Sequence, residues 1–355
     1  MSGPAAQDDD AGLHEAITRA LEEAESVVLT THVTPDGDGL GSALALARHL
    51  QRRGKTASVI NCSSTPHDLR WMYDRGEFHV YNGGKHEKKV IHADAIVATD
   101  IGGSERLGKM LDPVKRSKGT RIVIDHHIYD NDLFDLALIR AEASSSAEVT
   151  YDLLRHMGAT IDRSIAEPLY VGLVSDTGGF AYSATSPRAH TMAASLLEAG
   201  VDPQQVFRKT QCQVPASKMR FLGLMMSRLN YEADERVVWT AVDLEYLREQ
   251  QTAPRDAFEI VNHFLRVKGV EVGAFFMEIS KTRTKVSLRS AGSVDVCSIA
   301  KEHGGGGHRF AAGCTVDDKG LPDAVPYILA KLSALLPETD EDGDSPEQHG
   351  EASPR

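Results

Sequence analysis

Residues 27–50, VVLTTHVTPDGDGLGSALALARHL, contain the pattern that decides the fold. The apolar run at residues 27–31 predicts a short buried strand, and residues 40–53 have the apolar spacing of an amphipathic helix. The turn between them carries His32, Asp36 and Asp38. A strand that passes through a short polar turn into a helix is typical of proteins in which strands and helices alternate.

The same alternation continues to about residue 200. Further short strands are predicted at residues 57–61, 95–99 and 121–124, and helices at residues 147–157, 165–174 and 188–199. Strands that alternate with helices predict an α/β fold with a mostly parallel sheet that is covered on both faces. Functional side chains are then expected at the carboxyl ends of the strands.

The composition changes near residues 203–215, and the sequence predicts two domains. We expect a catalytic, metal-binding domain over residues 13–202, a linker and connecting helix over 203–230, and a smaller mixed α/β domain over 231–336. The polar segments at residues 1–12 and 337–355 lack apolar periodicity. Both are therefore predicted to be disordered tails, the second of them acidic.

The formal net charge is −12, and the two tails account for nine of these negative charges. Long duplex nucleic acid is bound by a broad basic surface that contacts many phosphates. A near-neutral body therefore argues against a long duplex and favours a short or small phosphate substrate. No apolar run is long enough to span a membrane, and the first thirty residues lack a basic start followed by an apolar run. We expect a cytoplasmic protein that does not bind membranes.

Acidic and histidine side chains follow the predicted strands. They are His32, Asp36 and Asp38 after the first strand, Asp100 after residues 95–99, Asp125, His126 and His127 after residues 121–124, and Asp176 after a further apolar segment. A single aspartate before a helix is usually only an N-cap, so the argument depends on the joint pattern. Because the carboxyl ends of parallel strands share one edge of a sheet, five carboxylates and two or three imidazoles are expected to converge there.

Such a cluster needs positive charge, because like charges a few ångströms apart oppose ionisation. No lysine or arginine lies within these short motifs. Two divalent cations would supply the charge, and mixed carboxylate and imidazole ligands suit Mn²⁺ first, with Mg²⁺, Fe²⁺ and Co²⁺ as alternatives. The four cysteines have no CxxC spacing, which argues against a structural zinc site. A carboxylate that bridges two metals about 3.5–4 Å apart is the arrangement used for phosphoryl transfer.

Five motifs resemble those of a known family. HVTPDGD at residues 32–38, Asp100 after a strand, DHH at residues 125–127 and Asp176 after GLVS resemble the four motifs of the DHH phosphoesterases. GGGGHRFAAGC at residues 304–314 resembles the glycine-rich motif of the companion DHHA1 domain. The resemblance covers about residues 13–336 and is closest to bacterial nanoRNases that also dephosphorylate 3′-phosphoadenosine 5′-phosphate (pAp). It implies a parallel-sheet DHH domain and a smaller mixed α/β DHHA1 domain, with the site in an interdomain cleft.

The resemblance also implies a role for each site residue. His32 and Asp36 would bind one metal ion, Asp38 and His126 the other, Asp100 would bridge them and Asp176 would complete the second site. Asp125 would orient a histidine, and His127 would face the substrate phosphate as the candidate donor to the leaving sugar oxygen. In the second domain, Arg289 would grip a substrate phosphate, and backbone N–H groups of Gly305, Gly306 and Gly307, followed by His308, would approach an anion closely.

The predicted function is that of a Mn²⁺-dependent phosphoesterase. It would hydrolyse short oligoribonucleotides and dinucleotides such as pApA or cyclic di-AMP to mononucleotides, and pAp to AMP, by attack of a hydroxide that two metals activate. The alternatives are a RecJ-like single-strand exonuclease, a manganese pyrophosphatase and a non-catalytic nucleotide-binding sensor. All six predicted metal ligands are present, which argues against the sensor. A homodimer is the expected protein partner.

Overall fold

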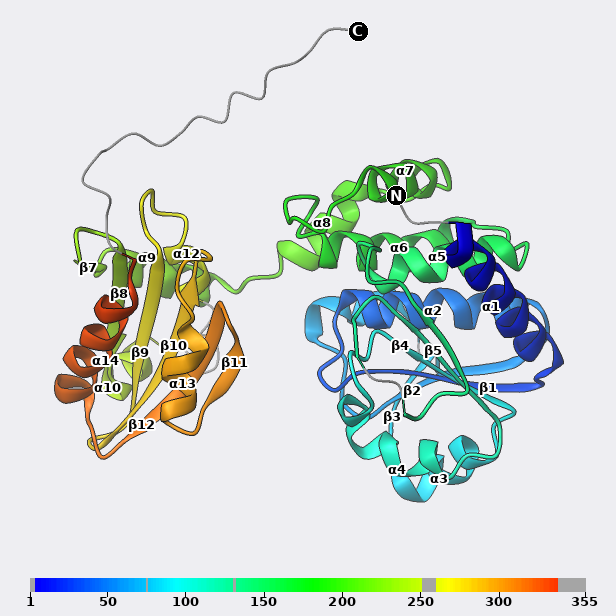
Figure 1. Cartoon of the computed structure of the whole chain (residues 1–355), viewed down its shortest axis with the longest axis horizontal. Coiled ribbons are helices and arrows are strands. Elements are labelled where there is room, and N and C mark those ends of the chain that lie inside the picture. Colours follow the sequence, from blue (N-terminus) through cyan, green and yellow to red (C-terminus); the bar gives the residue numbers. More distant parts are fainter. Residues whose placement is uncertain (1–3, 75, 130–131, 251–259, 338–355) are drawn as a thin grey trace, which may run out of the picture. The chain divides into compact units, whose positions relative to one another are not determined.

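The computed structural model describes residues 4–74, 76–129, 132–250 and 260–337. The chain divides into two compact units, Met1–Gln213 and Val214–Arg355 (Figure 1). The predicted α/β class is confirmed in both units. No helix among the described residues combines the length and the apolar character that crossing a membrane requires.

The first unit is built on a six-stranded, fully parallel sheet in the order β3-β2-β1-β4-β5-β6. Its strands are β1 Ser26–Thr31, β2 Thr56–Asn61, β3 Phe78–Val80, β4 Ala95–Thr99, β5 Thr120–Asp125 and β6 Leu136–Ile139. The parallel sheet predicted from the sequence is confirmed. The sequence pattern missed β3 and β6, because these two edge strands of three and four residues are too short to show a period.

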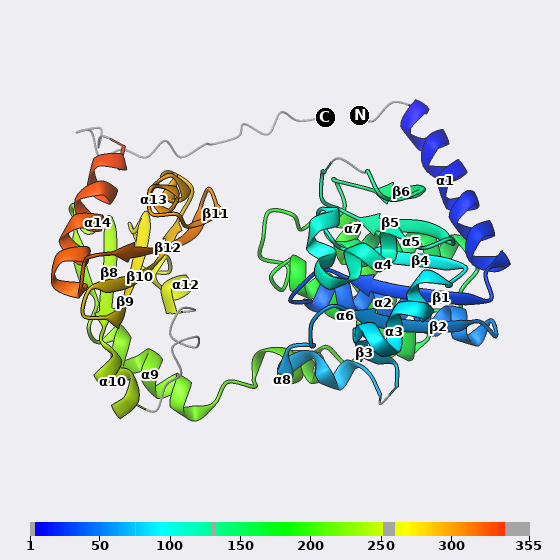
Figure 2. The same ribbon diagram turned by 90° about the horizontal axis from the view of Figure 1, so that it is seen from below.

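Helices cover both faces of this sheet. They are α1 Pro4–Glu23, α2 Gly37–Arg52, α3 Gly83–Ile91, α4 Leu111–Lys115, α5 Ser146–His156, α6 Arg163–Asp176, α7 Pro187–Glu198 and α8 Pro203–Gln211, with 3₁₀ turns η1 His67–Met72 and η2 Ser104–Met110. Helices α2, α5 and α6 lie on one face and α3 and α4 on the other (Figures 1 and 2). Helix α2 approaches α6 closely at Gly41, where a methyl group on Cα would lie 2.2 Å from the carbonyl oxygen of Pro168.

Two segments differ from the predicted tail and linker. Helix α1 begins at Pro4, so residues 4–12 are helical rather than part of a disordered tail. The reason is that Ile17 and Leu21 are fully buried and anchor the helix, which then extends toward its N-terminus. The first part of the predicted linker is α8, whose Val206 is buried in the core of the first unit. The predicted acidic tail lies outside the described residues except for Pro337.

The second unit has a mixed sheet in the order β11-β12-β10-β9-β8-β7, in which only the β8–β9 pair is parallel. Its strands are β7 Asn230–Glu232, β8 Val237–Val242, β9 Val272–Ser280, β10 Arg283–Ser290, β11 Gly306–His308 and β12 Ala311–Asp317. Its helices are α9 Ala216–Met226, α10 Leu244–Glu249, α12 Val261–Phe264, α13 Val296–Glu302 and α14 Leu321–Leu335. Gly306 and Gly307 of the glycine run at residues 304–307 therefore lie in the edge strand β11.

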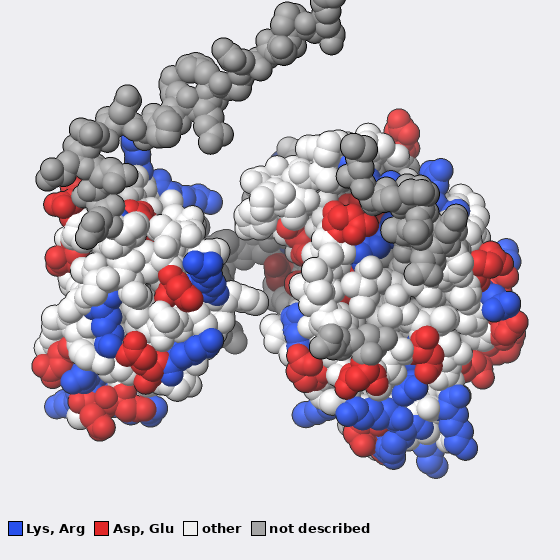
Figure 3. All heavy atoms as spheres, in the orientation of Figure 1, with Lys and Arg blue, Asp and Glu red and all other residues white. Residues whose placement is uncertain are grey.

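The surface charge is uneven. Basic side chains gather at the lower edge of the first unit in Figure 3, over α3, α4 and the end of η2. They are Lys85, Lys88, Lys89, Lys109, Lys115, Arg116 and Lys118. Two acidic residues in this region, Glu87 and Asp112, both pair with Arg116. The near-neutral sum that the sequence suggested for the folded body therefore hides one local basic patch.

Candidate metal centre

The turn after β1 places His32 beside Asp36. Oδ1 of Asp36 accepts hydrogen bonds from the N–H groups of Asp38 (3.0 Å) and Gly39 (3.1 Å), so Asp36 is the N-cap of α2. Its other oxygen, Oδ2, lies 3.3 Å from Nε2 of His32. Capping the helix and facing the imidazole are therefore done by different oxygens of one carboxylate. Asp36 can therefore be both the N-cap of α2 and a candidate metal ligand.

Asp100 lies between two imidazoles. It directly follows β4, is only 2% exposed and has a left-handed backbone with φ of 55°. Its Oδ2 is 3.5 Å from Nε2 of His32, and its Oδ1 is 3.7 Å from Nε2 of His126. A left-handed conformation is uncommon outside glycine, although aspartate tolerates it better than most residues. This turn of the backbone lets one carboxylate present a separate oxygen to each histidine.

Asp125 is fully buried, and both of its oxygens are occupied by hydrogen bonds. Oδ2 accepts from the N–H groups of Ile101 (2.9 Å) and Gly102 (2.8 Å), and Oδ1 accepts from the N–H groups of His126 (2.8 Å) and His127 (3.0 Å). Burial alone would raise the pKa of Asp125, but the hydrogen bonds from His127 and from the backbone lower it. Asp125 thus ties the loop after β4 to the loop after β5.

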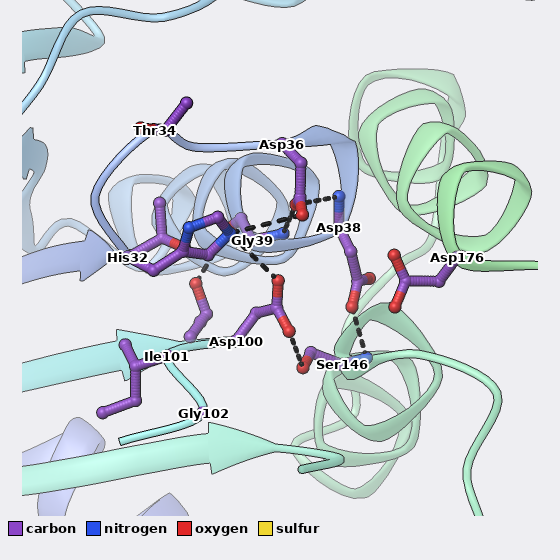
Figure 4. Close-up of polar contacts among 12 residues, drawn as sticks. His32, Thr34, Asp36, Asp38, Gly39, Asp100, Ile101, Gly102, Ser146 and Asp176 are labelled. Atoms are coloured by element: carbon purple, nitrogen blue, oxygen red, sulfur yellow. Dashed lines mark hydrogen bonds and ion pairs between the residues drawn. The ribbon is translucent and has the colours of Figure 1, made fainter. Parts of the chain in front are cut away.

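Asp176 reaches the cluster from a helix. It is the last residue of α6 rather than the end of a strand, so the prediction that every acidic residue comes from the strand edge was wrong here. The packing of α6 along α2 brings the Asp176 carboxylate to the cluster, where its Oδ2 lies 3.0 Å from Nε2 of His126. Figure 4 shows Asp176 facing Asp38 from the neighbouring helix.

Residues at the N-terminus of α5 donate hydrogen bonds to the carboxylates of Asp38 and Asp100. Asp38 is fully buried, and its oxygens accept from the N–H groups of Ser146 (2.6 Å) and Ala147 (2.8 Å). The Ser146 hydroxyl donates to Oδ1 of Asp100 at 3.2 Å (Figure 4). Burial, and then the charges of Asp100 and Asp176, raise the pKa of Asp38 well above its usual value. The neighbouring Ser145 caps α5 by accepting a hydrogen bond from the N–H group of Glu148, whereas the contacts of Ser146 belong to none of the sequence motifs.

The ligand atoms form three overlapping groups that share Asp100. One group is His32, Asp36 and Asp100, a second is Asp38, Asp100, His126 and Asp176, and a third is Asp100, His126 and His127; within each group, one ligand atom per residue lies within 4.8 Å of the others. Nε2 of His32 and Nε2 of His126 are buried without a hydrogen-bond partner among the described residues. Their Nδ1 atoms instead face the carbonyls of Val33 (2.6 Å) and Ala143 (3.3 Å), which leaves each Nε2 lone pair for a cation. The residues present fit two divalent ions with oxygen and nitrogen ligands.

His127 is the exposed member of the DHH motif. Its side chain is 44% exposed, and its Nδ1 lies 2.9 Å from Oδ1 of Asp125. The carboxylates of Asp100 and Asp125 raise the pKa of His127 to about 10 in the metal-free protein. A pocket of about 310 Å³ adjoins the centre at Asp36 and Ser175, whereas a larger pocket of about 700 Å³ lies at the far end of α2 around Arg48. Of these two pockets, only the smaller one is lined by a candidate metal ligand, Asp36.

In the second unit, the predicted substrate residues Arg289 and His308 lie on two strands that both pair with β12. Arg289 of β10 and His308 of β11 are both paired with Ala311 of β12, so they project to one face of the sheet about 10 Å apart. Nε of Arg289 donates to Oδ1 of Asn262 at 2.7 Å, and Nη1 donates to the carbonyl of Leu288 at 2.9 Å. Burial lowers the pKa of the Arg289 guanidinium, and His308 is exposed.

The glycines of this edge have two different roles. A methyl group on Gly305 would lie 2.3 Å from the carbonyl oxygen of Gly313, and one on Gly307 would lie 2.4 Å from that of Ala311. These two glycines are required by the packing of the hairpin. A methyl group on Gly306 would meet no atom within 4 Å, so the space beside its Cα is open. Packing therefore requires glycine at positions 305 and 307 and not at 306, and the anion contact of the three N–H groups stays a prediction.

Comparison with known proteins gives matches over most of the chain. Residues 26–173 match the model of the DHH family, N-terminal domain, and residues 235–338 match that of the DHHA1 domain. The bifunctional oligoribonuclease and PAP phosphatase NrnA of Thermus thermophilus is 31% identical over 321 residues, which are 90% of this chain and 93% of that protein.

Two solved structures have a similar fold. An exopolyphosphatase-related protein from Bacteroides fragilis superposes with a TM-score of 0.83 at 29% identity, over 91% of this chain and 97% of that one. Exonuclease RecJ bound to manganese superposes with a TM-score of 0.53 at 16% identity, over 92% of this chain and 95% of RecJ. The second likeness shows the fold alone.

Proposed function

Since the chain belongs to the DHH phosphoesterase family, we propose that it is a Mn²⁺-dependent enzyme that hydrolyses short oligoribonucleotides and dinucleotides to mononucleotides, and pAp to AMP. The resemblance drawn from the five motifs is confirmed by the two family models. The substrate class is supported by the name of the relative from Thermus thermophilus, an oligoribonuclease and PAP phosphatase. The proposed substrates include the dinucleotides pApA and cyclic di-AMP.

One observation carries the proposal: two groups of ligand atoms share the Asp100 carboxylate. We assign one cation to His32, Asp36 and Asp100, and a second to Asp38, Asp100, His126 and Asp176. The preference for Mn²⁺ is supported by the mixed oxygen and nitrogen donors and by the manganese in RecJ, which has the same fold. When bound, two such cations neutralise phosphate oxygens and lower the pKa of water, so that hydroxide is available near neutral pH.

The residues around the cations have separate tasks in this mechanism. The N–H groups of Ser146 and Ala147 keep Asp38 in place, and the Ser146 hydroxyl keeps Asp100 in place. Asp125 fixes the ring of His127, whose exposed side chain can donate a hydrogen bond or a proton to the leaving sugar oxygen. No serine or cysteine nucleophile is needed.

The second unit would select the substrate. Arg289 is held by Asn262 and by its own strand, so its planar guanidinium is oriented before a phosphate arrives. Gly306, which has open space beside its Cα, and the side chain of His308 lie two strands away on the same sheet. We assign these three groups to a phosphate or nucleotide end away from the reacting phosphorus.

A hydrolysis panel tests the proposal. The full chain is incubated in Mn²⁺ with pApA, cyclic di-AMP, a five-nucleotide RNA, pAp and inorganic pyrophosphate, with an EDTA-treated sample as control. We expect AMP from pApA and pAp, mononucleotides from the RNA, and no turnover in EDTA. Turnover of pyrophosphate alone would replace the substrate class with that of a pyrophosphatase, and binding of pApA without turnover would identify a sensor.

The RecJ-like alternative differs in its length dependence. A single-strand exonuclease would degrade a 24-nucleotide strand at least as well as a five-nucleotide one, whereas the proposed enzyme would favour the short strand. The cytoplasmic location and the homodimer expected from the sequence stay predictions.

A further inference from the structure

Arg106, a positively charged residue that the predicted motifs do not include, lies beside the candidate metal centre. Arg106 belongs to η2, which follows Asp100 in the chain. Its backbone carbonyl accepts a hydrogen bond from the N–H group of Val33 at 2.7 Å, and Val33 directly follows His32. The next residue, Leu107, is fully buried. The backbone of Arg106 is therefore fixed relative to the first predicted metal ligand.

The Arg106 guanidinium lies next to the ring of His127. A methyl group on Cα of Gly102 would lie 3.0 Å from Nη1 of Arg106 and 3.4 Å from Cγ of His127. The two side chains thus border the same small space, which the missing side chain of Gly102 leaves open. The N–H group of Gly102 donates to Oδ2 of Asp125 at 2.8 Å, so this space lies directly over the loop that Asp125 holds.

The guanidinium of Arg106 makes no ion pair or hydrogen bond with any residue that the structure describes, although the residue is half-buried. Other partly buried arginines of the first unit are paired: Arg48 with Glu77 at 2.8 Å, and Arg121 with Asp135 at 2.8 Å. A guanidinium has five N–H donors, and partial burial without an acceptor is unfavourable. An acceptor supplied by a ligand would remove that cost.

We propose that Arg106 binds an oxygen of the phosphate that reacts at the metal centre, next to His127. This inference rests on the proposed function. The planar fork of arginine matches phosphate oxygens, and the charge-assisted bond is stronger than a neutral one. The reacting phosphate is common to pApA, RNA and pAp, so the contribution of Arg106 is the same for all of them. Arg289, in contrast, is assigned to a group away from the reacting phosphorus.

A purely structural role would have a different signature. If Arg106 only held the turn after β4 in place, its removal would lower Tm and weaken Mn²⁺ binding together with activity. If Arg106 binds phosphate, its removal makes the cluster more negative, so Mn²⁺ affinity is kept or increased while substrate binding is lost. Mn²⁺ affinity should therefore fall if the role is structural, and stay the same or rise if Arg106 binds phosphate. Measuring Mn²⁺ affinity and substrate binding together separates the two roles.

The experiment compares Arg106→Ala, Arg106→Lys and a control, Arg116→Ala, which removes an exposed arginine that pairs with Glu87 on the outer surface. We measure kcat and KM for pApA and pAp in Mn²⁺, Mn²⁺ binding by calorimetry, and Tm. For Arg106→Ala we expect kcat/KM to fall about 10- to 100-fold on both substrates, with Mn²⁺ affinity kept or increased. Arg106→Lys should recover part of the loss, and Arg116→Ala should match the wild type.

Several results would overturn the inference. They are wild-type kinetics in Arg106→Ala, a loss confined to one substrate, or a loss of Mn²⁺ binding in parallel with activity. Calorimetric binding of AMP in Mn²⁺ adds a readout that does not depend on turnover, and Arg106→Ala should weaken it about tenfold or more. A wild-type protein that hydrolyses neither substrate refutes the proposed function, while this AMP comparison still decides the inference.

Discussion

The acidic centre of the first unit and the arginine–glycine edge of the second handle charge in opposite ways. Asp38, Asp100 and Asp125 are at most 2% exposed, and backbone N–H groups or a hydroxyl occupy their outer oxygens. At the edge of the second unit, Gly306 and His308 are exposed, and only Arg289 is held by neighbours.

The difference agrees with what each region is proposed to bind. Several carboxylates can share one buried space only if a fixed frame and cations balance their repulsion. A phosphate that arrives from water needs donors that are accessible and oriented, which an exposed sheet edge provides. Damage to the first region should therefore abolish the chemistry, whereas damage to the second should weaken substrate binding.

The largest expected effect comes from the carboxylate shared by both ligand groups. Asp100→Ala should lower kcat on pApA about 1,000-fold or more, which is about 4 kcal/mol of activation free energy, because both cations lose a ligand. The control is Asp94→Ala at the opposite end of β4, where the carboxylate only accepts hydrogen bonds from Ser26 and Glu25. Appreciable residual turnover would contradict the bridging role.

The pH dependence of stability should distinguish the two units. In the metal-free protein, burial lowers the pKa of His32, but Asp100 and Asp36 raise it to about 9, above the usual 6.5. A pKa raised by folding stabilises the fold below pH 6.5, and this contribution is lost as the pH rises through 9. The loss is at most about 3 kcal/mol, and bound Mn²⁺ should abolish it.

The two tryptophans allow this pH effect to be measured unit by unit, because Trp71 lies in the first unit and Trp239 in the second. Urea unfolding followed by fluorescence in Trp239→Phe reports the first unit, and in Trp71→Phe the second. The midpoint of the first unit in EDTA should fall from pH 6.5 to 9, and His32→Asn should reduce that fall, while the raised pKa of His127 accounts for a further part of it. An unchanged midpoint in the His32-containing protein would contradict the predicted sign.

A smaller effect is expected at the second unit. Arg289→Ala should raise KM for pApA about 10- to 100-fold and leave kcat within a fewfold, because one charge-assisted contact to the substrate is lost. Arg283→Ala is the matched control, since Arg283 lies on the same strand and pairs with Asp317. An equal fall in kcat would show that the two regions are not separate in function.

The smallest effect should come from Ser146, which donates hydrogen bonds to the carboxylates of the acidic centre. Ser146→Ala removes the hydroxyl that donates to Asp100 and should lower Mn²⁺ affinity about tenfold, as measured by calorimetry. The neighbouring Ser145→Ala removes only the N-cap of α5 and should cost about 1 kcal/mol of stability without changing Mn²⁺ affinity. Equal losses of affinity in both variants would show that α5 acts only as a whole helix.

Much of the fold and of the site is local in the sequence. The alternation of apolar strands and amphipathic helices predicted the parallel sheet, because side-chain period depends only on neighbouring residues. His32, Asp36, Asp100 and the DHH motif could be found for the same reason: each lies at the end of its strand or in the turn after it, so the strand order brings them to one edge. The glycine run could be found as a motif. The sequence could not show that Gly305 and Gly307 are required by packing and that Gly306 is not.

Tertiary packing alone decided the remainder. Asp176 enters the cluster because α6 packs on α2, and Ser146 meets Asp38 across 108 residues of chain. Arg106 stands outside every motif and is brought beside His127 by the turn after β4. A linear pattern records which residues are near in the chain, whereas these contacts depend on how helices and turns dock after the sheet has formed. The amino-acid sequence by itself therefore determined which residue types are candidate ligands and at which edge of the sheet they lie. The packed structure determined which residues surround them, namely Ser146 and Arg106.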